Sequence, residues 1–308
     1  MQMISESMLS NITDTVINYS PQPIPEYDTN ISCKPLLKWP GGKASELSEI
    51  ATRIPKHNRY FEPFFGGGSV YFNAINKQAY INDTHPDLML FYKLVKTHNT
   101  KFFLLLDNFI FEWNSNKNER EAIYYKIRKR YNETNRLTIE KAVDFFILRE
   151  YAYGGMFRVN LKGEFNVPFG YNYVNKDIQK KIDYLNSNSV LEKLSYAEIY
   201  TIDFQRFVNK FKFNKNDFMF VDPPYHCSFS KYDKDDFGVK DQERLANYLL
   251  NFKGKFMLVI QYTDLIKELY KSNKLNIYIY DKKYKFNIKG RFNRSVKHAL
   301  ITNYDTNI

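Results

Sequence analysis

Cysteine and histidine are scarce in this chain of 308 residues, which contains two cysteines and five histidines. Cys33 and Cys227 lie far apart in the sequence, and the histidines are scattered. No spacing typical of metal ligands appears, so we expect no metal site. With so few thiols, the simplest expectation is a reduced, cytoplasmic protein without a structural disulfide.

Long apolar runs are also missing. None approaches the roughly 20 residues that span a bilayer, so we expect no membrane association. Residues 1–33 lack the basic and then apolar pattern of a signal peptide. They are rich in Ser, Asn, Thr and Pro, which predicts a disordered N-terminal extension.

Aromatic and basic residues are plentiful. The formal net charge is +11 at pH 7, and aromatics make up 17% of the residues. Both properties suit a polyanionic partner whose bases can be stacked. The hydrophobic fraction of 44% permits a substantial core. The length fits one large α/β domain with an insertion, or two modest domains.

Asp222, Pro223, Pro224 and Tyr225 follow a run of four apolar residues at 218–221. The run predicts a buried strand, and the two prolines end it, because proline cannot continue a strand or a helix. An Asp carboxylate and proline carbonyls are acceptors, suited to the amino group of adenine or cytosine. Tyr225 could stack on that base, a contact worth about 1–3 kcal/mol.

A glycine loop follows an earlier predicted strand. Phe65-Gly66-Gly67-Gly68 leads into a predicted helix, and the loop lets a ligand approach the backbone. The start of a helix also favours a negative group. The loop matches neither the phosphate-binding loop nor the NAD fingerprint, so an amino-acid carboxylate or a nucleoside fits as well. Asp83 ends the next predicted strand, where an acid typically binds ribose hydroxyls.

Two further segments carry groups that could bind a ligand. In the turn Trp39-Pro40-Gly41-Gly42-Lys43, Lys43 could bind a carboxylate and Trp39 could cover a ligand. Residues 151–170 combine Gly, Asn, aromatics and Arg, which can reach base edges.

The remaining pattern predicts the fold. Residues 86–150 show four stretches of helical periodicity, and beyond residue 198 strands alternate with helices. Alternation of this kind indicates a mainly parallel sheet, and the final strands, which lack an intervening helix, predict an antiparallel edge strand.

Together and in this order, the motifs Trp-x-Gly-Gly-Lys, Phe-Glu-Pro-Phe-x-Gly-Gly-Gly, Asn-Asp and Asp-Pro-Pro-Tyr resemble those of Dam-type DNA adenine-N6 methyltransferases. An Arg-x-Asn pair and Glu-Phe-Asn-Val-Pro-Phe-Gly lie between them, and the likeness runs from about Lys34 to Tyr304. It implies an α/β, Rossmann-like methyltransferase sheet from residues 34–96 and 186–308. Residues 97–185 would form an inserted helical target-recognition domain. S-adenosylmethionine would be the cofactor and double-stranded DNA the substrate.

The resemblance also assigns roles to residues. Its cofactor-binding positions are Trp39, Lys43, Phe65, Gly66, Gly67, Gly68, Asp83, Asp203, Phe204 and Asp222. A flipped target adenine would be held by the corner Asp222, Pro223, Pro224 and Tyr225. DNA contacts are expected from Tyr153, Met156, Arg158, Asn160, Pro168, Arg291, Asn293 and Arg294.

One position departs from the pattern. Gly154 stands where several relatives carry Asn, which leaves recognition of GATC open. The Asp-Pro-Pro-Tyr chemistry also permits cytosine-N4 or RNA as the methyl acceptor, and a catalytically silent DNA-binding protein is a further alternative. A monomer would suffice for a short duplex site. A cognate restriction endonuclease acting separately is compatible with the sequence.

Overall fold

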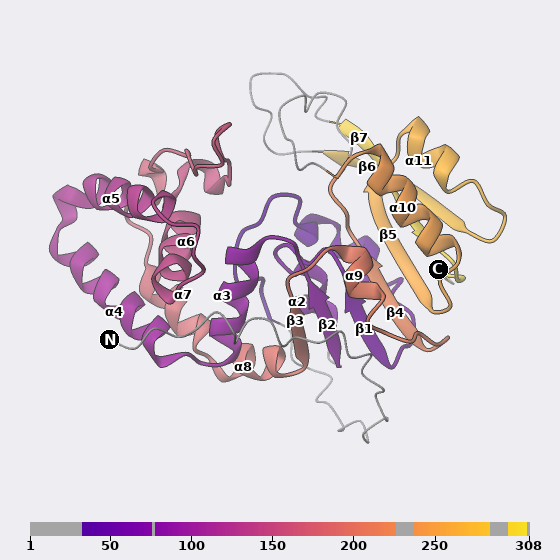
Figure 1. Cartoon of the computed structure of the whole chain (residues 1–308), viewed down its shortest axis with the longest axis horizontal. Helices are drawn as coiled ribbons and strands as arrows, with labels where there is room; N and C mark the ends of the chain where they lie inside the picture. The colour runs from indigo at the N-terminus through magenta and orange to yellow at the C-terminus, as the bar shows by residue number, and fades with distance from the viewer. Residues whose placement is uncertain (1–32, 76–77, 226–236, 284–294, 307–308) are drawn as a thin grey trace, which may run out of the picture.

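A seven-stranded sheet organises the computed structural model, which describes residues 33–75, 78–225, 237–283 and 295–306. Its strand order is β3-β2-β1-β4-β5-β7-β6 (Figure 1). The strands are β1 Arg59–Glu62, β2 Ala79–Asn82, β3 Ala197–Tyr200, β4 Asp217–Val221, β5 Lys255–Gln261, β6 Asn276–Lys283 and β7 Ser295–Thr302.

The sheet confirms the expected α/β class. Strands β1 to β5 pair in parallel, whereas β7 is antiparallel to both β5 and β6. The expected antiparallel strand is therefore present, but it lies one position in from the edge. The chain first places β6 at the edge and then returns through β7 into the space beside β5.

The strand order reverses between β1 and β4. From β1 the chain moves outward through β2 to β3, and β4 then pairs on the other side of β1. In open α/β sheets, ligands bind outside the carboxyl ends of the strands at such a point. Glu62 is the last residue of β1, and Asp222 directly follows β4.

The helices divide between two regions of the molecule. Figure 1 shows α4 to α7 together at one end, whereas α9, α10 and α11 lie by the sheet. The helices are η2 Lys43–Glu46, α1 Leu47–Ala51, α2 Ser69–Ala74, α3 Pro86–Lys96, α4 Thr100–Ser115, η3 Lys117–Glu119, α5 Arg120–Asn132, α6 Ile139–Tyr151, η4 Tyr153–Gly155, η5 Tyr171–Tyr173, α7 Ile178–Leu185, α8 Asn188–Ser195, α9 Phe204–Val208, α10 Val239–Leu250 and α11 Asp264–Leu269.

The four helices expected within residues 86–150 are confirmed as α3 to α6. Local capping explains where three of them begin. The side chains of His85, Asn99 and Thr138 accept a hydrogen bond from the first turn of α3, α4 and α6 respectively. Each cap satisfies a backbone N–H that has no partner within the helix.

Successive side chains along a strand point to opposite faces of the sheet, and apolar residues pack on both faces. In β4, Phe218 and Phe220 join one apolar cluster, whereas Met219 and Val221 join the other. The first cluster continues into helices α3 to α8, and the second lies beneath α9 to α11. Because β4 is buried on both faces, its carboxyl end is held rigidly.

Candidate functional site

The Asp-Pro-Pro-Tyr corner lies at the carboxyl edge of the sheet. β4 ends at Val221, and the Asp222 side chain that follows it is 18% exposed. Burial raises the pKa of the Asp222 carboxyl, and the Lys43 ammonium opposes that rise only in part. On α10, Gln242 donates a hydrogen bond of 2.9 Å to the Pro224 carbonyl, which fixes the corner.

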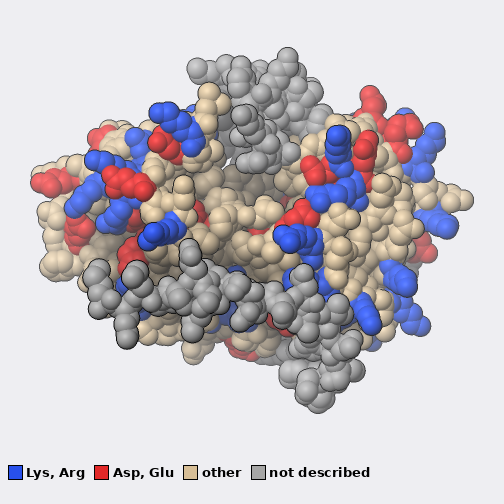
Figure 2. Space-filling view, viewed as in Figure 1, with Lys and Arg blue, Asp and Glu red and all other residues tan. Residues whose placement is uncertain are grey.

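A cavity of about 360 Å³ lies beside this corner. It is bounded by the corner, by the loop between β1 and α2, and by residues 39–43. The structure thus brings together predicted residues from four separate segments, namely Trp39, Lys43, Phe65, Gly66, Gly67, Gly68, Asp83, Asp222, Pro223, Pro224 and Tyr225. In Figure 2 the surface is hollowed between the helical end and the sheet.

The glycine loop packs tightly against aromatic side chains. Gly68 has a φ of +64°, and a Cβ there would lie 2.4 Å from the Phe65 ring. A Cβ on Gly66 would lie 2.9 Å from the Trp39 ring. The ring of Phe65 is itself buried and meets Tyr92 edge-on. The glycines therefore serve the packing of the loop itself, in addition to any approach of a ligand.

We expect Gly68→Ala to lower the free energy of unfolding by about 1–3 kcal/mol more than Gly163→Ala, because only the first variant overpacks its surroundings. Gly163 has a φ of +78°, and a Cβ there would have no neighbouring atom within 4 Å. The Gly163→Ala variant therefore pays only the cost of placing alanine at a positive φ. Urea denaturation of both variants measures the difference. Equal losses would show that the Phe65 ring moves aside freely.

Asp83 directly follows β2, and its side chain binds the glycine loop. Its carboxylate accepts hydrogen bonds from the Gly66 N–H at 2.8 Å and the His85 N–H at 2.9 Å. Burial raises the pKa of this carboxyl, and these backbone donors oppose the rise. Asp83 therefore has a structural task as well as the ribose-binding task expected for it.

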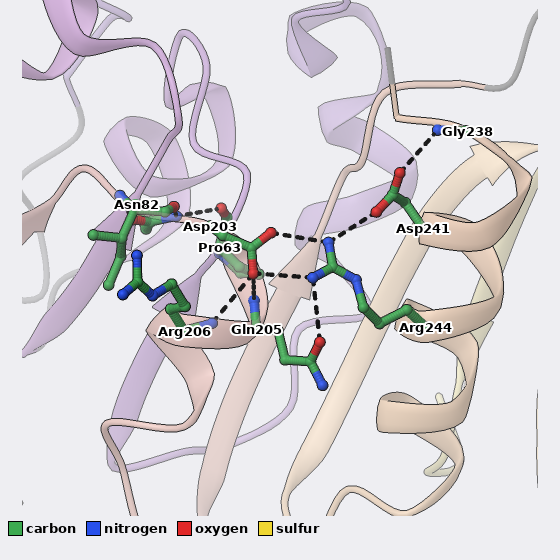
Figure 3. A network of polar contacts seen from close by, with 9 residues as sticks. Pro63, Asn82, Asp203, Gln205, Arg206, Gly238, Asp241 and Arg244 are labelled. Carbon is green, nitrogen blue, oxygen red and sulfur yellow. Dashed lines mark hydrogen bonds and ion pairs between the residues drawn. The ribbon is translucent and has the colours of Figure 1, made fainter. Parts of the chain in front are cut away.

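Asp203, the cap of α9, lies in a polar network beyond this cavity (Figure 3). Its carboxylate accepts from the N–H groups of Gln205 and Arg206 and pairs with Arg244 of α10 at 2.9 Å. Arg244 also pairs with Asp241 at 2.8 Å. Asp203 and Phe204 are not part of the cavity lining among the described residues.

Aromatic rings connect this network to the cavity. Phe64 lines the cavity, and its ring lies 5.4 Å from that of Phe204 and 5.3 Å from that of Phe237. The Arg244 guanidinium covers the Phe204 ring at 4.4 Å. Arg244 was not expected here, since a lone arginine on a polar helix face carries no signal in the sequence.

Glu62 is a second residue of the site that was not expected from the sequence. It ends β1, lines the cavity and is only 2% exposed. Its carboxyl accepts a hydrogen bond of 2.7 Å from the Tyr60 hydroxyl. Burial raises its pKa well above the ordinary value for glutamate, although the Tyr60 hydrogen bond acts in the opposite direction. The sequence feature that could have identified Glu62 is its place in Phe-Glu-Pro-Phe, directly before the glycine loop.

Lys43 reaches into the cavity from η2. Its Nζ lies 2.6 Å from each carboxylate oxygen of Asp222 and donates to the Gly41 carbonyl at 2.8 Å. The same ammonium lies 5.2 Å from the centre of the Tyr225 ring. Lys43 was expected to bind a carboxylate, and the carboxylate that it contacts in this structure belongs to the protein.

The segment expected to read bases forms an exposed surface after α6. Tyr153 is 55% exposed, and its N–H donates to the carbonyl of Pro168 at 2.9 Å, so these two predicted residues adjoin. Met156 is half-buried beside Gly154, which has a φ of +63°. Phe157 stacks on Trp39 at 5.5 Å. The segment that was expected to read bases therefore contacts Trp39, which lines the cavity.

The other predicted DNA contacts differ in their surroundings. Exposed Arg158 donates to the Asn166 side chain at 2.8 Å. The Asn160 side chain is used within its own turn, where its Oδ1 accepts from the N–H groups of Lys162 and Glu164. Arg291, Asn293 and Arg294 lie outside the described residues, as do Cys227 and residues 1–32.

Within the described ranges, no cluster of three or more His, Cys, Asp or Glu residues could hold a metal ion. Likewise, no helix found in those ranges has the length and apolar character needed to cross a membrane.

Comparison with known proteins shows which enzymes this chain resembles. Residues 39–288 match the family model described as D12 class N6 adenine-specific DNA methyltransferase. The chain is 35% identical to the type II methyltransferase M.MjaIII of Methanocaldococcus jannaschii, over 88% of this chain and 99% of that protein. It is 31% identical to M.CviBI of Paramecium bursaria Chlorella virus NC1A, over 88% of this chain and the whole of that protein. It is 30% identical to the DNA adenine methylase of Salmonella typhi, over 78% of this chain and 85% of that protein.

Proposed function

Because the chain belongs to the D12 class of N6 adenine-specific DNA methyltransferases, we propose that its methyl donor is S-adenosylmethionine, held in the cavity between the glycine loop and Asp222. The observation that carries this proposal is the meeting of that loop with the Asp-Pro-Pro-Tyr corner where the strand order reverses. The enzyme methylates the exocyclic amino group of adenine in DNA.

The charges around the cavity fit this donor. Glu62, Asp83 and Asp222 contribute three carboxyl groups, against one ammonium from Lys43. Such an excess suits a ligand that carries a sulfonium and an ammonium. S-adenosylmethionine would supply an activated methyl group there.

We assign the parts of the donor to separate regions of the site. Trp39, Lys43 and the loop from Phe65 to Gly68 would hold its methionine end, and Asp83 its ribose. Asp203 and Phe204 would border its adenine, through the ring contact between Phe204 and Phe64.

Asp222 and the Pro223 carbonyl would activate the acceptor. The amino nitrogen of adenine is a weak nucleophile because its lone pair is delocalised into the ring. If the two oxygens accept its two hydrogens, the nitrogen moves toward tetrahedral geometry and gains electron density. These hydrogen bonds strengthen as positive charge develops, so they favour the transition state over the ground state.

The target base must leave the duplex to reach Asp222, at a cost of a few kcal/mol. Stacking on Tyr225 would offset part of that cost. The Tyr225 ring is held edge-on against His298 at 5.3 Å, which leaves its orientation defined before a base arrives.

Residues 97–185 are assigned to target recognition on double-stranded DNA. Tyr153, Met156, Arg158 and Pro168 lie on one exposed or half-exposed segment of this region, and Arg158 can donate two hydrogen bonds to guanine. Asn160 contributes by fixing the turn beside Arg158, in addition to any contact of its own.

Long-read modification sequencing tests the function directly. DNA from cells that lack other methylases and express this protein should carry N6-methyladenine at one short motif, and cells expressing Asp222→Asn should not. If the motif is GATC, glycine at position 154 is compatible with GATC recognition, although several relatives carry Asn there. Methylcytosine would move the acceptor to cytosine-N4. Unmodified DNA, from a soluble protein that binds S-adenosylmethionine, would favour an RNA acceptor.

A further inference from the structure

The contact between Lys43 and Asp222 conflicts with the role proposed for Asp222. Both carboxylate oxygens lie 2.6 Å from the Lys43 Nζ, which is the distance of a strong, charge-assisted hydrogen bond. The amino group of a neutral adenine is a weaker donor than an ammonium. A base that enters the corner therefore meets a carboxylate that is already ion-paired with Lys43.

The backbone of Lys43 is fixed, so only its side chain can relieve this conflict. Glu46, in the same turn of 3-10 helix, accepts hydrogen bonds from Tyr280 at 2.7 Å, Lys282 at 2.6 Å and His298 at 2.7 Å. Burial alone would raise the pKa of Glu46, but these three donors lower it to about 2. Glu46 is thus ionised at neutral pH and anchors η2 to the β6–β7 pair.

The Lys43 side chain is only 3% exposed, so its ammonium cannot be left without an anion. It can leave Asp222 only if another anion replaces that carboxylate inside the same cavity. The methionine carboxylate of the proposed donor is such an anion, and its expected binding region adjoins Lys43.

We propose that Lys43 keeps Asp222 closed to a base until the carboxylate of the bound cofactor draws the ammonium away. Lys43 is then a positioning residue that makes acceptance of the base conditional on the cofactor. This inference rests on the proposed function, because it takes S-adenosylmethionine and adenine as the two ligands.

The wild-type enzyme provides a test that requires no mutation. The probe is a duplex with 2-aminopurine directly beside the target adenine, whose fluorescence rises when that adenine leaves the stack. Saturating sinefungin, an unreactive analogue that retains the amino-acid carboxylate, should raise the extruded fraction about fivefold or more over the cofactor-free enzyme. Saturating 5′-methylthioadenosine, which lacks that carboxylate, should leave it near the cofactor-free value. Equal effects of the two ligands would overturn the proposal.

A variant gives an independent test. Lys43→Met should extrude the base without any cofactor, to about the level that the wild type reaches with sinefungin. Lys267→Met, which removes an exposed lysine on α11, should behave as the wild type does. The proposal would be contradicted if Lys43→Met, without cofactor, extruded the base no more than the wild type does. Failure of the proposed function would appear differently, as a wild type that neither binds sinefungin nor methylates DNA.

Discussion

Asp222→Asn is expected to lower kcat by about 100- to 1,000-fold, the loss typical of removing one group that stabilises developing charge. Asparagine keeps the shape of the side chain but replaces one acceptor oxygen with an N–H donor. That donor faces the amino group of the adenine, which is itself a donor. Single-turnover methylation of a duplex carrying the target motif measures the loss.

Stability must be separated from chemistry in this variant. Asp222→Asn leaves the buried Lys43 ammonium without its carboxylate, which can itself destabilise the fold. The double variant Asp222→Asn/Lys43→Met removes that problem and should retain a loss in kcat of at least about 100-fold. Asp281→Asn, which changes an exposed carboxylate on β6, should keep wild-type activity. A near-normal rate for Asp222→Asn would remove Asp222 from the chemical step.

The pH dependence of the wild type should reflect the same carboxyl group. Because the pKa of Asp222 is raised, the carboxylate form is lost at a higher pH than for an ordinary aspartate. As the pH falls, kcat/KM should therefore begin to decline above the usual aspartate range, and this acid limb should be absent from the residual activity of Asp222→Asn.

Glu62→Gln is expected to stabilise the cofactor-free protein while weakening cofactor binding. The pKa of the Glu62 carboxyl is raised well above its ordinary value, so the folded state holds a proton that the unfolded state releases. Stability of the wild type is then lost as the pH rises from the unfolded pKa through the folded pKa. Gln cannot ionise, so the advantage of the variant grows with pH.

Urea denaturation between pH 5 and pH 8 should show this divergence, with the difference in the free energy of unfolding in favour of the variant growing toward pH 8. In the wild type, the ammonium of bound S-adenosylmethionine should favour the ionised form of Glu62, which Gln cannot provide. The variant should therefore bind S-adenosylmethionine about 10- to 100-fold more weakly, as for the loss of a charge-assisted hydrogen bond. Calorimetric titration measures that affinity. A variant that loses stability at every pH would show that Glu62 serves mainly to satisfy the Tyr60 hydroxyl.

Local chemistry made much of this site predictable from sequence. Pro223 and Pro224 must end a strand, and Asp83 ends a second stretch predicted to be a strand, so the carboxyl ends of β2 and β4 could be placed in advance. Parallel strands bring such ends to one edge of the sheet, and the cavity lies there. The roles assigned to the residues around it stay predictions.

Contacts between distant segments could not be predicted in the same way. Lys43 and Asp222 are separated by 179 positions, and Asp203 and Arg244 by 41. Which cation meets which carboxylate depends on the packing of η2 and α10, and no periodicity encodes that packing. The side chain of Asn160 was expected on DNA, and its bonding within its own turn depends on the neighbouring backbone.

The placement of β7 between β5 and β6 has a consequence for biosynthesis. Of the seven strands, β7 is made last on the ribosome, yet it pairs with β5 and supplies the His298 that holds Glu46. Until residues 295–302 emerge, β5 has an open edge that can pair with other nascent chains. The turn that carries Lys43 also lacks one of its three anchors during that time. The methyltransferase site is therefore completed only once β7 has been made and has covered the open edge of β5.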